Sequence, residues 1–143
     1  MISKGIMQMN RIMQMNLRTL VCTLALTIAP VVQVSAAPRK VMCENFTATW
    51  CVYCPDMANG IIMLMDEFPD SFFSMQIHGG DSYATPWGNQ RNTFYGVPGY
   101  PTVWIDGVLG IEGSYGSASA NYSQLRSRYL QRVAAPTDVT ISA

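Results

Sequence analysis

Phe46 to Pro55 reads FTATWCVYCP and contains two cysteines separated by two residues, Cys51 and Cys54. A strand-like segment precedes this stretch, and a helix-like segment follows it. Cys-x-x-Cys at the first turn of a helix suits thiol–disulfide chemistry, because the unpaired N–H groups and the helix dipole favour a thiolate there. The stretch therefore predicts Cys51 as the nucleophile and Cys54, one turn later, as the resolving thiol.

A structural role is the alternative interpretation of this cysteine pair. Closing so short a loop at a helix start does little to stabilise a fold. The spacing therefore favours a redox pair over a static disulfide.

Length and composition indicate one domain of ordinary globular type. The chain has 143 residues, 49% of them hydrophobic and 13% charged, with a formal net charge of zero. It is long enough to bury a packed core. No run of Lys or Arg indicates nucleic-acid binding.

The N-terminal segment differs in character from the rest. An apolar run over residues 20–34 leads to the small residues Ser35 and Ala36, and it follows three basic residues, Lys4, Arg11 and Arg18. This layout predicts a secretory signal peptide over residues 1–36, with Met15 as a second possible start. We therefore expect an exported protein, periplasmic, secreted or in the cell envelope. An uncleaved membrane anchor is the alternative, and the run is short for a span of about 20 residues.

Cleavage after Ala36 changes the charge and the cysteine count. It removes three of the nine basic residues and none of the nine acidic ones, which leaves a net charge near −3. Three cysteines remain, Cys43, Cys51 and Cys54. An odd number in an exported chain leaves at least one thiol outside an intramolecular pair.

Hydrophobic periodicity predicts the element order β-α-β-α-β-β-α for a domain over residues 37–134. Asp106-Gly107 predicts a tight hairpin turn between the last two strands. Residues 135–143 are either a tail or the start of a further domain. The expected strands are 40–46, 71–78, 102–105 and 108–111, and the expected helices are 54–68, 85–95 and 117–133.

Two of these segments carry more detailed expectations. In the helix over 54–68 the apolar face is expected to pack in the core, with Gly60 as a weak point where the helix kinks. In the strand over 71–78 we expect Phe73, Met75 and Ile77, or their neighbours, to be buried. The apolar residues of the helix are Met57, Ile61, Ile62, Met63, Leu64 and Met65.

The element order, Trp50 before the cysteine pair, and Gly-Tyr-Pro-Thr before the third strand together resemble the thioredoxin superfamily. The sequence VMCENFTATWCVYCP, together with IHGGD after the second strand, is similar to sequences of secreted bacterial thioredoxin-like proteins described as outer-membrane-protein related. The resemblance implies an α/β fold with a central four-stranded mixed sheet flanked by helices. It also implies a protein-disulfide oxidoreductase that needs no cofactor.

The resemblance assigns further residues to the site. Pro101 is expected to be cis and to lie against a Cys51–Cys54 disulfide. Tyr100 and Trp50 are expected to line the substrate groove, where the Tyr100 backbone pairs with an extended substrate strand. The implied partners are protein thiols or disulfides and an upstream redox protein that resets the pair.

The sequence departs from this family at the buried acid. Thioredoxins carry an acid six residues before the first cysteine, where it assists proton transfer, and here that position is Asn45. Glu44 is one residue earlier, and one step along a strand turns a side chain to the opposite face. Glu44 and Asn45 are therefore candidates for a proton relay, with a solvated or capping Glu44 as the alternative.

Two further functions remain open. The chain is either a catalyst or a non-catalytic thioredoxin-fold binding module, in which the cysteine pair is a switch or a relic. A copper or zinc delivery protein using Cys51, Cys54 and His78 is the third possibility. A buried structural thiol at Cys43 and a surface or loop position for His78 are favoured, so no metal site is expected.

Overall fold

The computed structural model describes residues 39–136. The expected signal peptide over 1–36 and the segment 137–143 lie outside the described residues. The element order β-α-β-α-β-β-α confirms the prediction. The strands are β1 (Val41–Thr47), β2 (Phe72–His78), β3 (Thr102–Ile105) and β4 (Leu109–Glu112), and the helices are α2 (Cys54–Glu67), α3 (Pro86–Tyr95) and α4 (Ala118–Val133).

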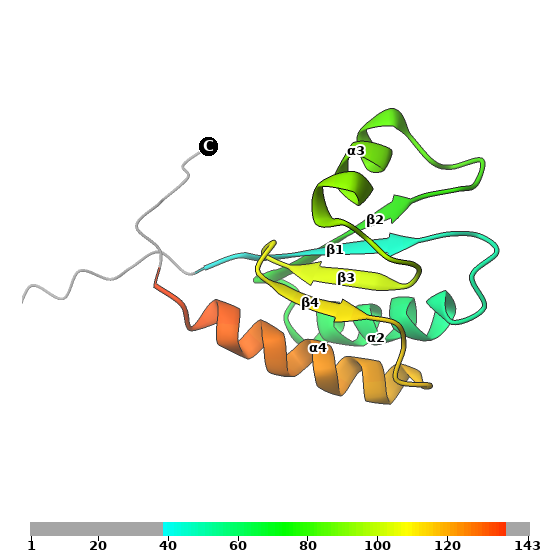
Figure 1. Cartoon of the computed structure of the whole chain (residues 1–143). Helices are drawn as coiled ribbons and strands as arrows, with labels where there is room; N and C mark the ends of the chain where they lie inside the picture. Colours follow the sequence, from blue (N-terminus) through cyan, green and yellow to red (C-terminus); the bar gives the residue numbers. More distant parts are fainter. Residues whose placement is uncertain (1–38, 137–143) are drawn as a thin grey trace, which may run out of the picture. The chain divides into compact units, whose positions relative to one another are not determined.

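The four strands form one mixed sheet in the order β2-β1-β3-β4. β1 pairs with β2 in parallel, while β3 is antiparallel to both of its neighbours. A parallel pair needs a crossover connection, and α2 supplies it between β1 and β2. Figure 1 shows α2 and α4 on one face of the sheet and α3 on the other.

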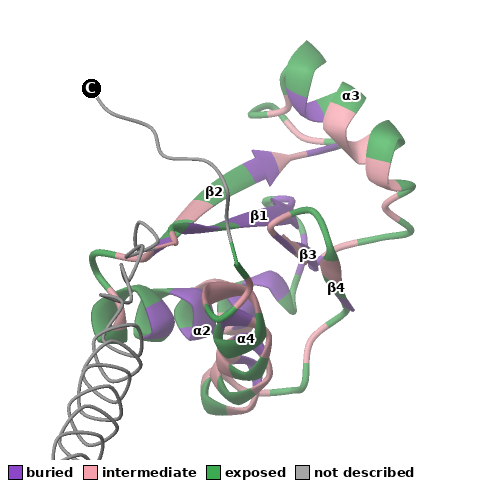
Figure 2. Ribbon diagram, turned by 90° about the vertical axis from the view of Figure 1, so that its left-hand side faces the viewer, coloured by how far each residue is buried: buried purple, intermediate pink, exposed green. Residues whose placement is uncertain are grey.

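The main core lies between the sheet and the α2–α4 pair (Figure 2). Alternate residues of β1, Val41 and Cys43, point into it, as expected for a strand whose successive side chains face opposite ways. The other buried members are Met57, Ile61, Leu64, Phe72, Val103, Ile105, Ile111, Leu125 and Tyr129.

Helix α2 buries a narrower face than the sequence predicts. Met57, Ile61 and Leu64 are buried at helical spacing, whereas Ile62 is exposed. Met63 and Met65 are also exposed, so the expectation of one crowded apolar face was wrong for half of its members. Among the described residues, α2 packs chiefly against α4 and the sheet, which cover one side of it, so the buried face is narrow.

Gly60 marks a close approach between helices, and the kink expected there stays a prediction. α2 runs unbroken through this position, and a Cβ on Gly60 would lie 2.9 Å from Ala118 O, Asn121 Cβ and Tyr122 N of α4. The glycine is therefore required by contact with α4.

The opposite face of the sheet is only partly covered. Ile77 of β2 is buried on this face, but Phe73 and Met75 are about two-fifths exposed, while their neighbour Phe72 is buried in the main core. Of the expected trio Phe73, Met75 and Ile77, only Ile77 is buried, because α3 covers one end of this face (Figure 2).

Within residues 39–136, no helix has the length and apolar character needed to cross a lipid bilayer.

Candidate active site

Cys51 and Cys54 form a disulfide where β1 leads into α2. The S–S distance is 2.10 Å and the Cα–Cα distance is 5.4 Å. Both cysteines pack with Ala48, and Tyr100 lies against the same small cluster. Cys51 keeps 8% of its surface exposed and Cys54 keeps 4%, so Cys51 is the more accessible residue of the pair.

Helix α2 begins at Cys54, as the expected range 54–68 predicts, so Cys51 precedes the first helical residue. Cys51 lies in the preceding turn, where its carbonyl oxygen accepts a hydrogen bond from Cys54 N at 3.3 Å. Tyr53 is the N-cap residue and its side chain makes no capping hydrogen bond. The positive end of the α2 dipole therefore lies beside Cys51 without a side-chain acceptor from Tyr53, which favours a thiolate there.

The loop before β3 brings an aromatic residue to the cysteine pair. The Tyr100–Pro101 peptide bond is cis, and Pro101 is buried. The Tyr100 ring lies 5.7 Å from the Trp50 ring, measured between centroids. The structure thus brings together Cys51, Cys54, Trp50 and Tyr100 from two segments of the chain, residues 50–54 and the loop before β3.

The loop after β2 contacts both of these segments. Gly80 O accepts a hydrogen bond from Trp50 Nε1 at 3.1 Å, and Gly79 N donates to Thr47 O at 3.0 Å. A Cβ on Gly79 would collide with Tyr100 Oη, so only glycine fits this position. Loop residues 79–81 therefore join the turn before Cys51 to the loop that carries Pro101.

Asp81 ends this loop and holds the turn before Cys51. Its Oδ2 accepts from Thr49 N at 2.7 Å and is 2.7 Å from His78 Nδ1, while its Oδ1 accepts from Tyr83 N at 2.9 Å. The pKa of Asp81 is lowered to about 2, chiefly by the hydrogen bond to His78. The sequence analysis did not assign Asp81 to the site. The signal that could have found it is the Gly-Gly-Asp sequence directly after a buried strand.

Glu44 and Asn45 lie on opposite faces of the sheet. The Glu44 carboxylate is buried on the α3 side, where it accepts from Arg91 at 2.6 to 2.8 Å and from Tyr95 Oη at 2.6 Å. The alternative of a solvated Glu44 was wrong. Burial, and then the hydrogen bond to Glu44, raise the pKa of Tyr95 to about 12, which keeps the phenol a donor.

Asn45 is fully buried and shares the sheet face of Cys43. Its Nδ2 donates to Gln76 Oε1 at 2.8 Å, whereas its Oδ1 has no hydrogen-bond partner. An amide cannot carry a proton as a carboxyl group does, so Asn45 can only orient neighbouring groups.

Cys43 lies in the main core, away from the disulfide cluster. It is fully buried, and burial raises its pKa from 9.0 to about 12. A thiol with this pKa is protonated at neutral pH and is a poor nucleophile.

His78 is held by Asp81, and the residues named for metal delivery do not form a ligand cluster. Across residues 39–136, no group of three or more His, Cys, Asp or Glu side chains is placed to hold a metal ion. His78 also lies 5.3 Å from the Tyr83 ring, between ring centroids. His78 therefore contributes to the loop after β2.

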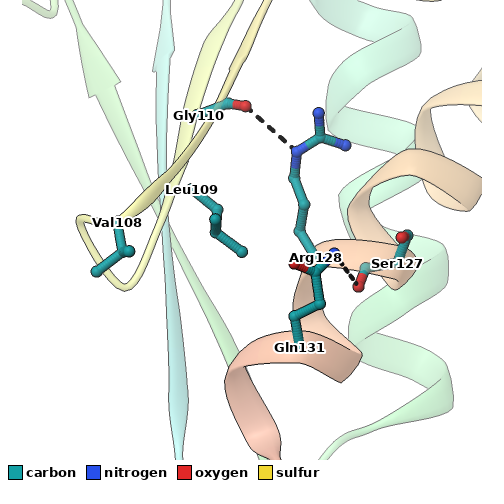
Figure 3. A pocket seen from close by; sticks show the side chains of 6 residues that line it. All are labelled: Val108, Leu109, Gly110, Ser127, Arg128 and Gln131. Atoms are coloured by element: carbon teal, nitrogen blue, oxygen red, sulfur yellow. Dashed lines mark hydrogen bonds between the residues drawn. The ribbon is translucent and has the colours of Figure 1, made fainter. Parts of the chain in front are cut away.

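A shallow hollow of about 410 Å³ lies between β4 and α4, and Figure 3 shows its lining. Arg128 crosses it and donates from Nε to Gly110 O at 3.2 Å. None of its lining residues belongs to the disulfide cluster, so the hollow is separate from the candidate active site.

No family model matches the chain. No curated protein matches it either.

Solved structures do resemble it. A thioredoxin of Fasciola hepatica is 23% identical, with 65% of this chain and 81% of that chain covered and a TM-score of 0.48. A thioredoxin of Malassezia sympodialis, Mala s 13, is 21% identical over 69% of this chain and 80% of that chain, with a TM-score of 0.50. HBP35 of Porphyromonas gingivalis is 27% identical over 70% of this chain, with a TM-score of 0.51, and this chain covers 34% of its length.

The likeness to the last two structures shows a thioredoxin-like fold and confirms the fold class predicted from the sequence. Together with a Cys-x-x-Cys pair at disulfide distance, this fold supports thiol–disulfide redox chemistry in general. The narrower resemblance to outer-membrane-protein-related sequences stays a prediction.

Proposed function

We propose that this chain is an exported protein-disulfide oxidoreductase that exchanges disulfides with protein thiols through Cys51 and Cys54. The observation that carries the proposal is the Cys51–Cys54 disulfide placed directly before α2 in a thioredoxin-like fold. Export rests on the N-terminal pattern of residues 1–36.

The chemistry requires only the two sulfurs and a substrate. In the reduced protein, the Cys51 thiolate attacks a substrate disulfide and forms a mixed disulfide, while one substrate sulfur leaves as a thiolate and takes up a proton. The Cys54 thiolate then attacks Cys51 Sγ, which closes the protein disulfide and releases the second substrate thiolate. Two electrons pass to the substrate, and a partner dithiol must return them. The same steps in reverse oxidise a substrate dithiol.

The helix start explains the division of roles between the sulfurs. The α2 dipole stabilises negative charge on Cys51, which both increases its thiolate fraction and makes it the better leaving group. Cys54 is the first residue of α2 and is less exposed than Cys51, so its thiol reacts with the mixed disulfide only after Cys51 has formed it.

The surface around the pair favours apolar substrate segments. Trp50, Val52 and Tyr53 are all more than half exposed next to the disulfide. Large exposed apolar groups at one place mark a contact surface. We therefore expect clients that present a cysteine in an extended, apolar segment, as unfolded or partly folded chains do.

A trapping experiment tests the proposal. Cys54→Ser leaves Cys51 able to capture a client but removes the thiol that releases it. After incubation of the reduced variant with secreted proteins that carry scrambled disulfides, Cys51 should hold clients as mixed disulfides that disappear on reduction, as mass spectrometry would show.

The matched control is the double variant Cys51→Ser, Cys54→Ser, and both variants are made without residues 1–36, so that the control retains only Cys43. It should trap nothing, because Cys43 is buried and protonated. Equal trapping by both variants, or none by Cys54→Ser, would contradict the proposed exchange and favour a binding module.

A further inference from the structure

Asp81 connects three parts of the candidate active site. Its carboxylate accepts the backbone N–H of Thr49, two residues before Cys51, and it bonds His78 at the end of β2. The loop that carries Asp81 also meets the Pro101 loop, because Tyr100 Oη lies against Gly79, and the charge of Asp81 adds to burial in raising the pKa of Tyr100.

The position is shielded, although it lies in a loop. Only 3% of the Asp81 side chain is exposed. Its hydrogen bonds keep it ionised at neutral pH, because its pKa is lowered to about 2. A charge shielded from water acts over a longer distance than an exposed one.

The other acids near the pair are placed differently, and Asp56 lies in the first turn of α2 itself. The charge of Glu44 is paired with that of Arg91 on the α3 side of the sheet. Asn45, at the position where thioredoxins carry a buried acid, is an amide and has no charge. Asp81 is thus the carboxylate hydrogen-bonded to the turn that leads into Cys51.

We infer that Asp81 is a positioning residue for the redox pair: its carboxylate fixes the Thr49–Trp50 turn, and its negative charge disfavours the Cys51 thiolate. This inference deepens the proposed function and rests on its assignment of Cys51 and Cys54 as a redox pair. This role requires no contact between Asp81 and either sulfur. The carboxylate acts on Cys51 through the Thr49–Trp50 turn and through the electric field of its negative charge.

The test is Asp81→Asn, which keeps the size of the side chain but replaces one acceptor oxygen with a donor and removes the charge. Asp66→Asn is the matched control, because it removes one charge from an exposed position near the far end of α2. Both are compared with wild type in equilibrium with glutathione, where one protein disulfide and two glutathione thiols give a protein dithiol and one glutathione disulfide.

Two results are expected. Asp81→Asn shifts this equilibrium toward the dithiol about three- to tenfold, because the Cys51 thiolate loses a repelling charge, and the Cys51 thiolate absorbance titrates at lower pH. The Thr49 amide exchanges its hydrogen about tenfold faster, because asparagine has one uncharged acceptor oxygen where the carboxylate uses two, one for Thr49 N and one for Tyr83 N. Asp66→Asn stays within about twofold of wild type in all three measurements.

A shift toward the disulfide form, or values for Asp81→Asn equal to those of Asp66→Asn, would overturn the inference. If Asp81→Asn does not fold by circular dichroism, Asp81→Glu replaces it, since this variant keeps the charge but displaces the acceptor. Faster Thr49 exchange with a smaller shift in the equilibrium is then expected, and an unchanged Thr49 amide overturns the positioning role.

These measurements use the protein's own sulfurs and need no client turnover. An empty client trap together with a shifted glutathione equilibrium would reject the proposed function and keep the role of Asp81. Clients trapped by Cys54→Ser, together with an unchanged glutathione equilibrium in Asp81→Asn, would support the proposed function and reject the role of Asp81.

Discussion

Cys43 and Cys51 lie close together in the sequence, yet the fold gives them opposite chemistry. Cys43 points into the dry core between the sheet and the α2–α4 pair, where burial raises its pKa to about 12. Cys51 lies in a small separate cluster beside the start of α2 and is bonded to Cys54.

The physical reason is the local environment of each sulfur. Desolvation disfavours a thiolate in the core, whereas the positive end of a helix dipole favours one. The comparison teaches that a cysteine's position, more than its presence, decides whether it reacts. A substitution or a change of pH that alters the core around Cys43 or the cluster around Cys51 should therefore have different effects on stability and on redox activity.

The largest effect is expected from removing the reactive sulfur. Cys51→Ser should lower the rate of insulin reduction by about a thousandfold or more, because serine cannot form the mixed disulfide. Cys43→Ala should keep the rate within about twofold of wild type, since the Cys43 thiol takes no part in exchange. Equal rates for wild type and Cys51→Ser would remove the distinction between the two cysteines.

The second prediction separates core stability from redox behaviour. Ile61→Ala, in the core that holds Cys43, should lower the free energy of unfolding by about 2–4 kcal/mol, while leaving the glutathione equilibrium of the folded protein unchanged. Ile62, the next residue, is 53% exposed against 1% for Ile61. Ile62→Ala should cost less than about 1 kcal/mol. Urea denaturation measures both variants, and similar losses would contradict the assigned burial.

The third prediction tests the contact between α2 and α4. Gly60→Ala places a Cβ 2.9 Å from backbone atoms of α4, and neither helix can give way without shifting. We expect a loss of about 1–3 kcal/mol in the free energy of unfolding, although alanine is the better helix former by about 1 kcal/mol.

Asn59→Ala, at the exposed neighbouring position of α2, is the control for helix propensity and should be neutral or slightly stabilising. A stabilised Gly60→Ala protein would mean that the helices do not approach as closely as described.

The last prediction concerns alkaline pH, where the change in stability appears only when the pH exceeds 9. The folded protein holds the Cys43 proton more tightly than the unfolded chain does, because burial raises the pKa from 9.0 to about 12. This contribution to stability is complete below pH 9 and is lost as the pH rises toward 12, at up to about 1.4 kcal/mol per pH unit.

The Cys43→Ala variant has no thiol at this position and therefore lacks this pH-dependent contribution to stability. Its free energy of unfolding should therefore fall less steeply than that of wild type between pH 9 and 11, as urea titrations at each pH would measure. Tyr95 titrates in both proteins, so it cancels in the difference. Parallel curves would show that Cys43 is not desolvated.

The sequence predicted the fold well because its signals are local. Apolar strands, the Pro55 helix start and the Asp106-Gly107 turn each act over a few residues, and together they specify the element order. The errors arose where contact with a distant segment decides the outcome. Gly60 was expected to weaken α2 but is required by α4, and Phe73 was expected to be buried but lies where α3 does not cover the sheet.

The candidate site was predicted in part for the same reason. Cys51, Cys54, Trp50, Tyr100 and Pro101 were named from short motifs. Asp81 was missed, because Gly-Gly-Asp after a buried strand was taken only as the end of that strand, and the return of β2 beside β1 brings the acid to Thr49 N.

By itself, the sequence determined the order of the elements, the spacing of the cysteine pair and the glycines and prolines at the turns, because these depend on neighbouring residues. Only the tertiary structure decided which thiol is buried, which acid faces Arg91 and which one holds the turn before Cys51. Desolvation and charge–charge interactions depend on distances through space, and the fold alone sets those distances.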